Sequence, residues 1–403
     1  MAEKISVSEA LDRIERHVAP ALARRIALDA EAYGMVLAQP VKAAADAPPF
    51  DCSAMDGFAL ASSETLEATR QTPCELELAA DIPASNRQGI LRLGTAAPIS
   101  TGAPVPAGAD AVVAKERCRL ADGRVVISDP ISPGLNVRRQ GEDIFNGALV
   151  ANAGTILSPA LIGALLVFGV PRVEVRPRPG VTIIPTGSEF ASPGPSDSAM
   201  RIDSNGPMIG AMCRSLDLNV RVSDPVPDDP AILRMRLESL LDSPSADMIL
   251  STGGVSVGSH DHVREALEMV GARIVFHGVA MRPGKPILFA VLPDDRLFFG
   301  LPGNPVAALV GFRFFVVAAI RRMLGLDRER GRRIDAPQPA RDGVTQFLRA
   351  RLTENGAVVL ADDQRSHVMR SLIESDHWVR LDREASGSLA MLYPQEPHFM
   401  MGN

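Results

Sequence analysis

Aromatic residues and cysteines are scarce in this sequence, and each scarcity excludes a class of protein. Phenylalanine, tyrosine and tryptophan make up 4% of the 403 residues, which argues against a surface that stacks nucleic-acid bases. The four cysteines form no CxxC pair, so neither a zinc knuckle nor a disulfide framework is indicated, and a reducing, cytoplasmic location is expected. The net charge of −6 also argues against nucleic acid as a partner.

Long hydrophobic runs are absent as well. The longest, Val306 to Ile320, contains Arg313 and falls short of the roughly 20 apolar residues that span a bilayer, so it predicts a buried helix. Residues 1–10 carry acidic side chains and lack the apolar centre of a secretion signal. No membrane partner is expected.

Lysine is also rare, because only four of the 42 basic residues are lysine: Lys4, Lys42, Lys115 and Lys285. Lys285 stands in the segment Met-Arg-Pro-Gly-Lys-Pro, residues 281–286, which fails the pattern of an ATP-binding P-loop because proline follows the lysine. A compact ammonium on a flexible stem suits a phosphate or another oxyanion, and the alternative is an accidental surface lysine. We expect Lys285→Ala to impair function far more than Lys4→Ala.

The chain length predicts two to four domains, and the pattern of apolar, glycine and proline residues changes along the chain. Residues 7–18 have helical spacing behind a Ser6 cap, and a second short helix is expected over 29–39. From residue 41 to about 144, short apolar runs alternate with glycine and proline, which predicts a β-rich domain. Residues 327–341 are rich in arginine and predict a solvated linker, followed by strands of a small β domain.

Between residues 181 and 324, strands and helices alternate at the spacing of βαβ units, which predicts a mainly parallel sheet that ends in a long helix from Asn304 to Leu324. Ligands bind beyond the carboxyl ends of such strands. We therefore expect the turns at 185–187, 251–254 and 301–305 to line one crevice. There the backbone N–H groups of Gly253 and Gly254 can approach a phosphate.

Polar residues outside these turns are further candidates, each with a structural alternative. Asp51 and Asp56 lie in one loop framed by proline and glycine, where aspartate also caps turns. Thr101 offers a hydroxyl beside the free N–H of Gly102, which suits an oxyanion or simply connects a strand to a turn. Cys52 is a weak candidate nucleophile because no histidine lies near it in the sequence.

Two arginines precede two carboxylates at Arg138, Arg139, Glu142 and Asp143, which fits either an anion clamp or a salt-bridged surface turn. Asp261 is a better candidate than its neighbours His260 and His262, because two histidines without a third ligand do not make a metal site. Asn304 and Pro305 need only start a helix. The sequence contains no GxGxxG, GxSxG or HExxH motif.

Taken together, these motifs resemble those of the molybdopterin molybdotransferase family, the MoeA-like proteins and the E domain of gephyrin. The resemblance covers the chain from about residue 46 to 306 and keeps the family order over the segments 51–57, 101–106, 138–144, 186–189, 203–205, 251–258, 282–286 and 301–305. It implies a multidomain α/β fold, with a central molybdopterin-binding-type domain of mostly parallel sheet and helices on both faces, a β-rich insert and a C-terminal β-barrel-like domain.

The resemblance also implies four domains in an elongated homodimer: domain I at 1–45 and 145–177, domain II at 46–144, domain III at 178–326 and domain IV at 327–403. The family site lies between domain III of one subunit and domain II of the other. The family reaction inserts molybdate into adenylylated molybdopterin and releases AMP with the help of Mg²⁺. Other proteins of molybdenum cofactor biosynthesis are further partners that the resemblance suggests.

The resemblance implies roles for residues that match the family motifs. Those with a catalytic role are Asp56, Thr101, Asp143, Glu189, Asp203, Asp261, Arg282 and Lys285, and Glu189 and Asp203 are the expected Mg²⁺ ligands. Those that bind substrate are Arg138, Arg139, Ser251, Gly253, Gly254, Pro302, Gly303, Asn304, Pro305 and Ser371.

Two positions depart from the family pattern. Gly278 stands where the family often has a lysine, and Arg365 stands where a glycine is usual. Two other functions therefore stay open: a related molybdopterin adenylyltransferase or nucleotide hydrolase, and a catalytically weak dimeric scaffold. The domains outside the α/β unit argue against the first, and the intact charged motifs argue against the second.

Overall fold

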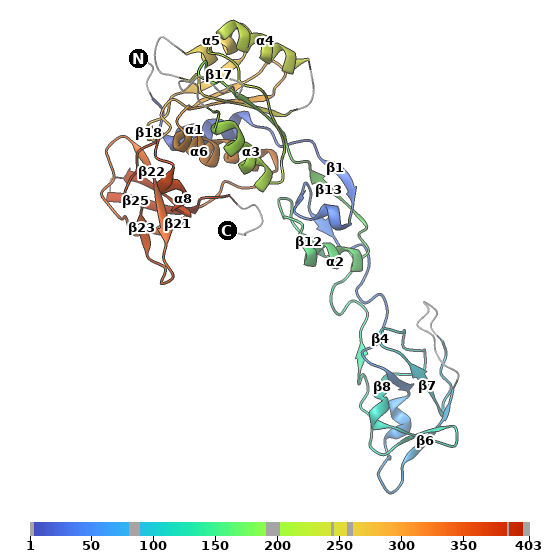
Figure 1. Ribbon diagram of the computed structural model, residues 1–403. Helices are drawn as coiled ribbons and strands as arrows, with labels where there is room; N and C mark the ends of the chain where they lie inside the picture. The colour runs from blue at the N-terminus through green and yellow to red at the C-terminus, as the bar shows by residue number, and fades with distance from the viewer. Residues whose placement is uncertain are drawn as a thin grey trace.

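The computed structural model describes residues 4–79, 89–190, 202–242, 246–255, 261–384 and 387–397. The molecule is elongated, with an α/β domain and a C-terminal sheet at one end and a β-rich insert domain at the other (Figure 1). A small middle domain joins the two ends. Among the described residues, no helix combines the length and the apolarity needed to cross a bilayer.

The α/β domain is built on a six-stranded sheet in the order β15-β14-β16-β20-β19-β17. The first four strands are parallel, as predicted. Strand β19 runs antiparallel to them, and β17, which pairs antiparallel with β19, runs in the same direction as the first four. The sequence analysis missed β19, because its four apolar residues follow the Pro-Gly-Lys-Pro segment without a helix between. The strand bounds are β14 Gly180–Pro185, β15 Asn219–Val222, β16 Met248–Thr252, β17 Arg273–His277, β19 Leu288–Val291 and β20 Leu297–Leu301.

Helices cover both faces of this sheet, as expected. On one face α4 (Pro230–Leu241) and α5 (His262–Met269) bury Leu237 and Leu267 against the sheet. On the other face lie α3 (Asn205–Ser215), α6 (Pro305–Gly311) and α7 (Val317–Met323). The predicted long helix is therefore interrupted, because a π-helical turn over Phe312–Val316 separates α6 from α7.

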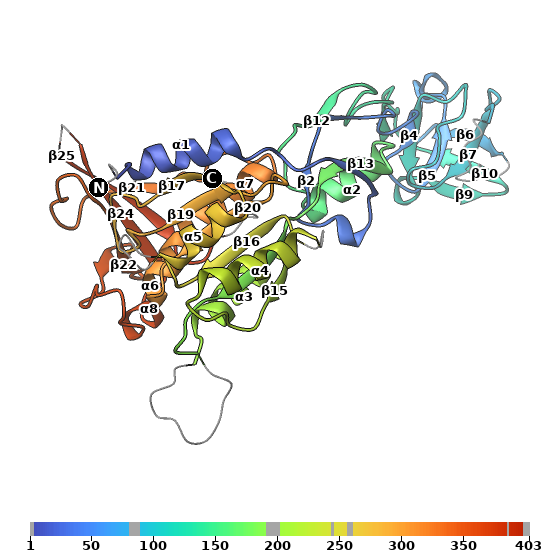
Figure 2. The ribbon, with the colours of Figure 1, turned by 90° about the horizontal axis from the view of Figure 1, so that it is seen from above.

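The first helix, α1 (Val7–His17), packs with the α/β domain. Ser6 caps it by accepting a hydrogen bond from the Glu9 N–H at 3.1 Å, as the sequence predicts. Its apolar face, including Leu11 and Ile14, joins the core of the α/β domain, and the helix lies along α7 (Figure 2). Residues 7–17 therefore pack away from the strands of domain I, to which the resemblance assigns them.

The middle domain consists of two small sheets and one helix. Strands β1 (Arg24–Ala27) and β2 (Val36–Leu37) flank β13 (Arg172–Arg176), and β3 (Val41–Lys42) pairs with β12 (Leu149–Ala151). The helix is α2, Pro159–Val167. The helix predicted over 29–39 is wrong: only one 3₁₀ turn forms, at Ala30–Ala32, because Gly34 then adopts a φ of +73° and the chain enters β2.

The insert domain is β-rich, as predicted. Its six-stranded sheet has the order β8-β5-β7-β6-β10-β9, and β4 pairs with β11 beside it. The strand bounds are β4 Cys52–Ser53, β5 Gly57–Leu60, β6 Cys74–Leu78, β7 Thr95–Ile99, β8 Ala111–Ala114, β9 Arg119–Ala121, β10 Arg124–Ile127 and β11 Val137–Arg138.

The C-terminal sheet is joined to the α/β domain by a shared core. The strand order is β18-β22-β24-β25-β21, with β23 paired to β22, and the short α8 (Arg370–Ile373) lies beside it. Phe314 of the π-helical turn contacts Phe347, Trp378 and Tyr393 of this sheet at ring-centroid distances of 4.3, 6.5 and 5.2 Å. The strands are β18 Met281–Arg282, β21 Arg332–Ile334, β22 Thr345–Leu352, β23 Val358–Leu360, β24 His377–Glu384 and β25 Gly387–Pro394.

The segment expected to be a solvated linker is instead tied to the protein. Arg328 pairs with Asp12 and Glu15 of α1 at 2.7 and 2.8 Å. Glu329 binds the buried Arg313 guanidinium through two hydrogen bonds of 2.6 and 2.8 Å. A charged segment can be a solvated linker, or its side chains can form ion pairs with the folded protein. Only the fold distinguishes these two cases.

The Arg313–Glu329 pair generates a stability prediction. Arg313 is 1% exposed, so Glu329→Ala leaves a buried guanidinium without its carboxylate and should lower the free energy of unfolding by about 3 kcal/mol. The fluorescence of Trp378, the single tryptophan and fully buried, reports the urea transition. Glu9→Ala, which removes exposed ion pairs on α1, should leave the midpoint unchanged, and an equal loss in both variants would contradict the prediction.

Candidate functional site

The three Gly-rich turns of the α/β domain meet at one edge of the sheet, as predicted. Thr186 donates its N–H to the Thr252 carbonyl at 2.9 Å, and Gly253 donates its N–H to the Leu301 carbonyl at 2.9 Å. The turn after β14 therefore lies against the turn after β16, which lies against the turn after β20. Parallel strands in one register bring these three carboxyl ends together.

Two glycines in this crevice are required by space and by backbone conformation. Gly253 has a φ of +97°, and a Cβ there would lie 2.4 Å from the Thr186 carbonyl oxygen. Gly254 has a φ of +63°, and its Cβ would lie 2.8 Å from Thr186 Oγ1. The chain at this turn can therefore approach both its neighbour and a ligand more closely than any side chain would allow.

The start of α3 lies against the turn after β20. Asp203 accepts hydrogen bonds from the N–H groups of Asn205 and Gly206 at 3.0 and 3.1 Å, and Asn205 Nδ2 donates to the Gly303 carbonyl at 2.7 Å. Ser251, at the end of β16, is fully buried, and its hydroxyl has no hydrogen-bond partner among the described residues. Asp203, Ser251 and Gly303 thus belong to one crevice.

The crevice opens into a cleft of about 470 Å³ shared with the C-terminal sheet. Arg282 and Lys285 line it from the 281–286 segment, and Gln364 to His367 line it from the opposite side. Met281 and Arg282 form β18, which pairs in parallel with Thr345 and Gln346 of β22, so this segment lies at the junction of the two sheets. Pro302, Gly303 and Asn304 complete the wall, and Pro305 follows as the first residue of α6.

Arg365, one of the two departures from the family pattern, is neutralised where it stands. Its guanidinium forms two hydrogen bonds of 3.0 and 2.5 Å with the carboxylate of Asp363. Arg365 holds the pKa of Asp363 at about 2. By contrast, neither Arg282 nor Lys285 has a carboxylate partner among the described residues. The uncompensated positive charge of the cleft therefore comes from these two side chains.

Carboxylates gather at the opposite end of the crevice, and one of them was missed. Glu189 is exposed on the turn after β14. Its neighbour Ser188 exchanges two hydrogen bonds with Asp228, whose Oδ2 lies 3.2 Å from the Ser188 N–H and whose own N–H lies 3.0 Å from the Ser188 hydroxyl. Asp228 stands before α4, 40 residues along the chain, where the Pro-Asp-Asp-Pro segment predicts only a helix cap.

Asp261 lies at the start of α5, where it accepts a hydrogen bond from the Arg264 N–H at 3.1 Å. Its other oxygen lies 3.3 Å from Nε2 of the half-buried His277, without the alignment of a hydrogen bond. Burial raises the pKa of Asp261 and lowers the pKa of His277. His262 belongs to α5, and His260 lies outside the described residues. No group of three or more metal-ligating side chains is found within the described ranges.

The remaining charged candidates lie in the insert domain, far from this cleft along the same chain (Figure 1). Thr101 donates both its N–H and its hydroxyl to Asp56 Oδ1, at 2.8 and 3.0 Å. These two bonds hold the pKa of Asp56 below its usual value, with a smaller contribution from the charge of Lys115. Asp56 and Thr101 therefore form one unit, in which Asp56 stays ionised.

The arginine-carboxylate segment after β11 is partly a surface ion pair. Arg139 lies 2.6 Å from Asp51, whereas Arg138 and Asp143 are exposed. Within a single chain, the described residues Arg138 and Asp143 therefore lie far from Lys285. Cys52 is buried, and burial raises the pKa of its thiol, which disfavours a nucleophilic thiolate.

The substrate-binding role of Ser371 stays a prediction, because its hydroxyl bonds to a residue near it in the sequence. It is buried on α8, where its hydroxyl donates to the Val368 carbonyl at 3.2 Å. Helix α8 follows the Gln364–His367 wall of the cleft by a few residues, but Ser371 is not among the side chains that line the cleft.

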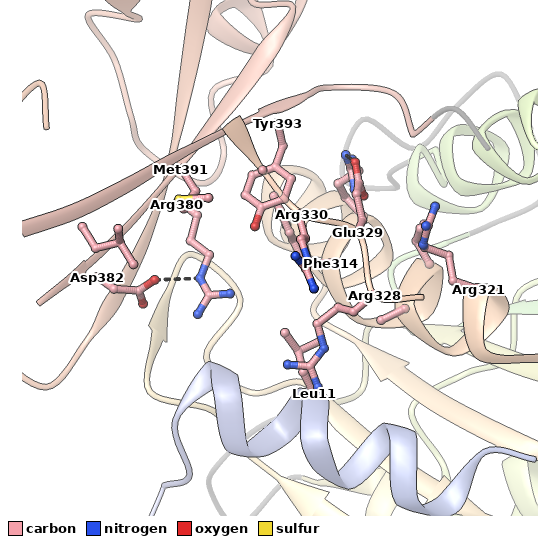
Figure 3. Close-up of a pocket in the computed structure, with 15 residues that line it drawn as sticks. Leu11, Phe314, Arg321, Arg328, Glu329, Arg330, Arg380, Asp382, Met391 and Tyr393 are labelled. Atoms are coloured by element: carbon pink, nitrogen blue, oxygen red, sulfur yellow. Dashed lines mark hydrogen bonds and ion pairs between the residues drawn. The ribbon is translucent and has the colours of Figure 1, made fainter. Parts of the chain in front are cut away.

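A second cavity, of about 340 Å³, lies between α1, the π-helical turn and the C-terminal sheet (Figure 3). Three of its arginines are paired with carboxylates: Arg313 as described above, Arg328 with α1, and Arg380, which lies 2.8 Å from Asp382. An anion in this cavity would compete with those carboxylates. The cavity is therefore best explained as the joint between the two sheets.

Comparisons with known proteins identify relatives over most of the chain. A family model described as the MoeA N-terminal region (domain I and II) matches residues 5–169, and one described as a probable molybdopterin binding domain matches residues 182–322. The chain is 33% identical to the molybdopterin molybdenumtransferase of Synechococcus elongatus over 94% of this chain and 95% of that protein. It is 37% identical to molybdopterin molybdenumtransferase 2 of Mycobacterium tuberculosis over 86% of this chain and 88% of that protein.

Solved structures with the same fold include two of the molybdopterin biosynthesis MoeA protein from Pyrococcus horikoshii. They superpose on this chain with TM-scores of 0.80 and 0.76 at 26% identity. They cover 96% and 97% of this chain, and the match spans 99% and 100% of theirs. The fold is therefore shared from end to end.

The crevice generates a prediction about Gly253. Gly253→Ala should lower the free energy of unfolding by at least about 2 kcal/mol, because the new Cβ meets the Thr186 carbonyl and the backbone conformation is strained. Gly343→Ala is the matched control, since Gly343 has a φ of +65° but open space around it, and it should cost only about 1 kcal/mol. Urea titrations followed by Trp378 fluorescence compare the two variants, and a Gly253→Ala protein as stable as the control would refute the close approach.

Proposed function

The chain belongs to the molybdopterin molybdenumtransferase family, and from that membership we propose that it inserts molybdate into adenylylated molybdopterin and releases AMP. The observation that carries the proposal is the cleft in which Arg282 and Lys285 face the Gly-rich crevice. The match of relatives over nearly the whole chain supports this function over that of a lone α/β enzyme, because the middle, insert and C-terminal parts are shared.

The positive groups of the cleft suit anionic substrates. Molybdate is a tetraoxo dianion and the pterin substrate carries phosphates, whereas the chain has a net charge of −6. Attraction must therefore be local. Arg282 and Lys285 supply this local attraction. The backbone N–H groups of the crevice turns add hydrogen-bond donors for an oxyanion without burying another charged side chain.

The carboxylates of the crevice fit Mg²⁺, which prefers oxygen ligands and keeps several waters when it bridges substrate phosphates. Asp203 accepts hydrogen bonds from the backbone N–H groups of Asn205 and Gly206, and Glu189 is exposed on the turn after β14. We assign Glu189 and Asp203 as the residues that hold Mg²⁺, with Asp228 close to Glu189 through Ser188. When bound, the ion neutralises charge that develops as the phosphate–phosphate bond of the adenylylated substrate breaks.

A second copy of the chain would complete the site. Asp56 precedes β5, Thr101 follows β7, and Arg138 lies on β11 with Arg139 and Asp143 after it, all in the insert domain. This domain stands at the other end of the molecule from β18, which Lys285 follows (Figure 1). If both groups act in one reaction, the insert domain of one subunit must reach the α/β domain of its partner. We therefore infer a homodimer with two composite sites.

The first test measures AMP released from adenylylated molybdopterin in the presence of molybdate and Mg²⁺. Lys285→Met should lower kcat/KM by roughly 100-fold, because it removes one of the two unpaired cations of the cleft. Lys42→Met, on exposed β3 of the middle domain, is the control and should change kcat/KM by less than about twofold. Wild-type protein that binds the adenylylated substrate without molybdate-dependent AMP release would favour the scaffold, and AMP release without molybdate would favour the hydrolase.

The second test asks whether sites form between subunits. Asp56→Asn and Lys285→Met should each retain about 1% of wild-type activity or less alone, whereas co-expressed subunits should recover about a quarter of it. This fraction follows because half of a random mixture is heterodimer, and each heterodimer has one intact site of two. No recovery, with heterodimers present by mass spectrometry, would place both residues in the site of a single subunit.

A further inference from the structure

The N-terminal segment brings a second lysine to Lys285. The sequence predicts that Lys4 matters far less than Lys285, but in the structure its stem lies next to Gly278, close to the backbone of Lys285, and the charge of Lys285 acts on it. Two of the four lysines of the chain therefore meet at one place. Lys4 is consequently unsuitable as the neutral control for Lys285.

The backbone before α1 holds Lys4 in this position. Ile5 forms a parallel β-bridge with Val279, and the Ala280 N–H donates to the Ile5 carbonyl at 2.8 Å. The Val279 N–H in turn donates to the Lys285 carbonyl at 2.9 Å. Ile5 packs against the core of the α/β domain, and Val7 directly after it is buried. Residue 4 is thus anchored beside the 278–286 segment.

The missing side chain of Gly278 gives room to the stem of Lys4. A Cβ at Gly278 would lie 4.0 Å from Cγ of Lys4 and 3.8 Å from the carbonyl oxygen of Lys285. The stem of Lys4 therefore lies next to Gly278, close to the backbone of Lys285. Lys4, from the N-terminal segment, thus occupies space next to Gly278, which has no side chain.

The two ammonium groups are unfavourable neighbours until an anion joins them. Contact with Lys285 and its charge lower the pKa of Lys4. Neither lysine has a carboxylate partner among the described residues, although ion pairs are abundant elsewhere. A dianion placed between two like charges turns their repulsion into two attractive contacts. Lys285 lines the 470 Å³ cleft, so such an anion would sit at its edge.

We propose that Lys4 and Lys285 together bind a dinegative oxyanion of the substrates, with Lys4 as a binding residue supplied by the N-terminal segment. The inference rests on the proposed function for the identity of the anion, which is molybdate or a phosphate group of the pterin substrate. The placement of Lys4 beside the Lys285 segment depends on the Ile5–Val279 bridge and the contact next to Gly278, and not on the proposed function. An arginine would not serve equally, because a planar guanidinium needs more room than the compact ammonium over Gly278.

Amine labelling tests the pair without any assay of activity. The full chain is acetylated at low reagent excess, and peptide mapping follows Lys4, Lys42 and Lys285, with inorganic molybdate or inorganic phosphate present in separate arms. We expect Lys4 to react faster than Lys42, and molybdate or phosphate to slow Lys4 at least about fivefold while Lys42 is unaffected. The arm that protects identifies the anion. Lys4 unprotected by both anions would overturn the proposal.

Variants separate a specific site from general attraction. Lys285→Met should abolish the protection of Lys4, and Lys4→Met should raise the KM for molybdate, or for the pterin substrate if phosphate protects, about tenfold with kcat within about twofold. Lys4→Arg should restore less than half of this loss, and Lys42→Met should behave as wild type. An unchanged KM in Lys4→Met would refute a role in substrate binding. Protection of Lys4 in a protein that releases no AMP would refute the proposed function and leave the anion site standing.

Discussion

The common register of β14, β16 and β20 is the constraint on which the candidate site depends. These three strands pair in parallel, so Pro185, Thr252 and Leu301 end at one edge of the sheet. The turn after β16 then has no space for a side chain, because the Thr186 carbonyl lies against Gly253. Without this register the charged residues that follow each strand would lie at unrelated places.

The position of the C-terminal sheet decides the second wall of the cleft. Phe314 packs on three aromatic residues of that sheet, and β18 pairs with β22, so the two sheets form one body. This places Gln364 to His367 across from Lys285. The insert domain, by contrast, has hydrophobic clusters made of its own described residues and stands at the far end of the molecule (Figure 1). One chain therefore carries two groups of candidate residues at opposite ends. This separation is the physical basis for expecting a second copy to bring the two groups together.

Charge in the molecule divides into paired and unpaired groups. Several arginines that line cavities are paired with carboxylates, including Arg313, Arg328 and Arg365. The lysines behave differently: Lys4 and Lys285 meet at the cleft, and Lys115 contributes to the low pKa of Asp56. The scarcity of lysine therefore points to Lys4 as well as to Lys285.

The sequence alone determined the order of elements and the local chemistry. Helical spacing and the Ser6 cap predicted α1, because a helix and its cap depend on neighbours in the chain. The alternation of strands and helices predicted the parallel part of the sheet, and the turns were expected to meet because the carboxyl ends of parallel strands share one edge. Only the tertiary structure decided what depends on distant partners. It placed Asp228 beside Ser188, paired Arg328 with α1, shortened the helix expected over 29–39 and laid Lys4 over Gly278. In each of these cases the deciding contact joins segments whose spacing along the chain carries no periodic signal, so packing rather than local preference determined the outcome.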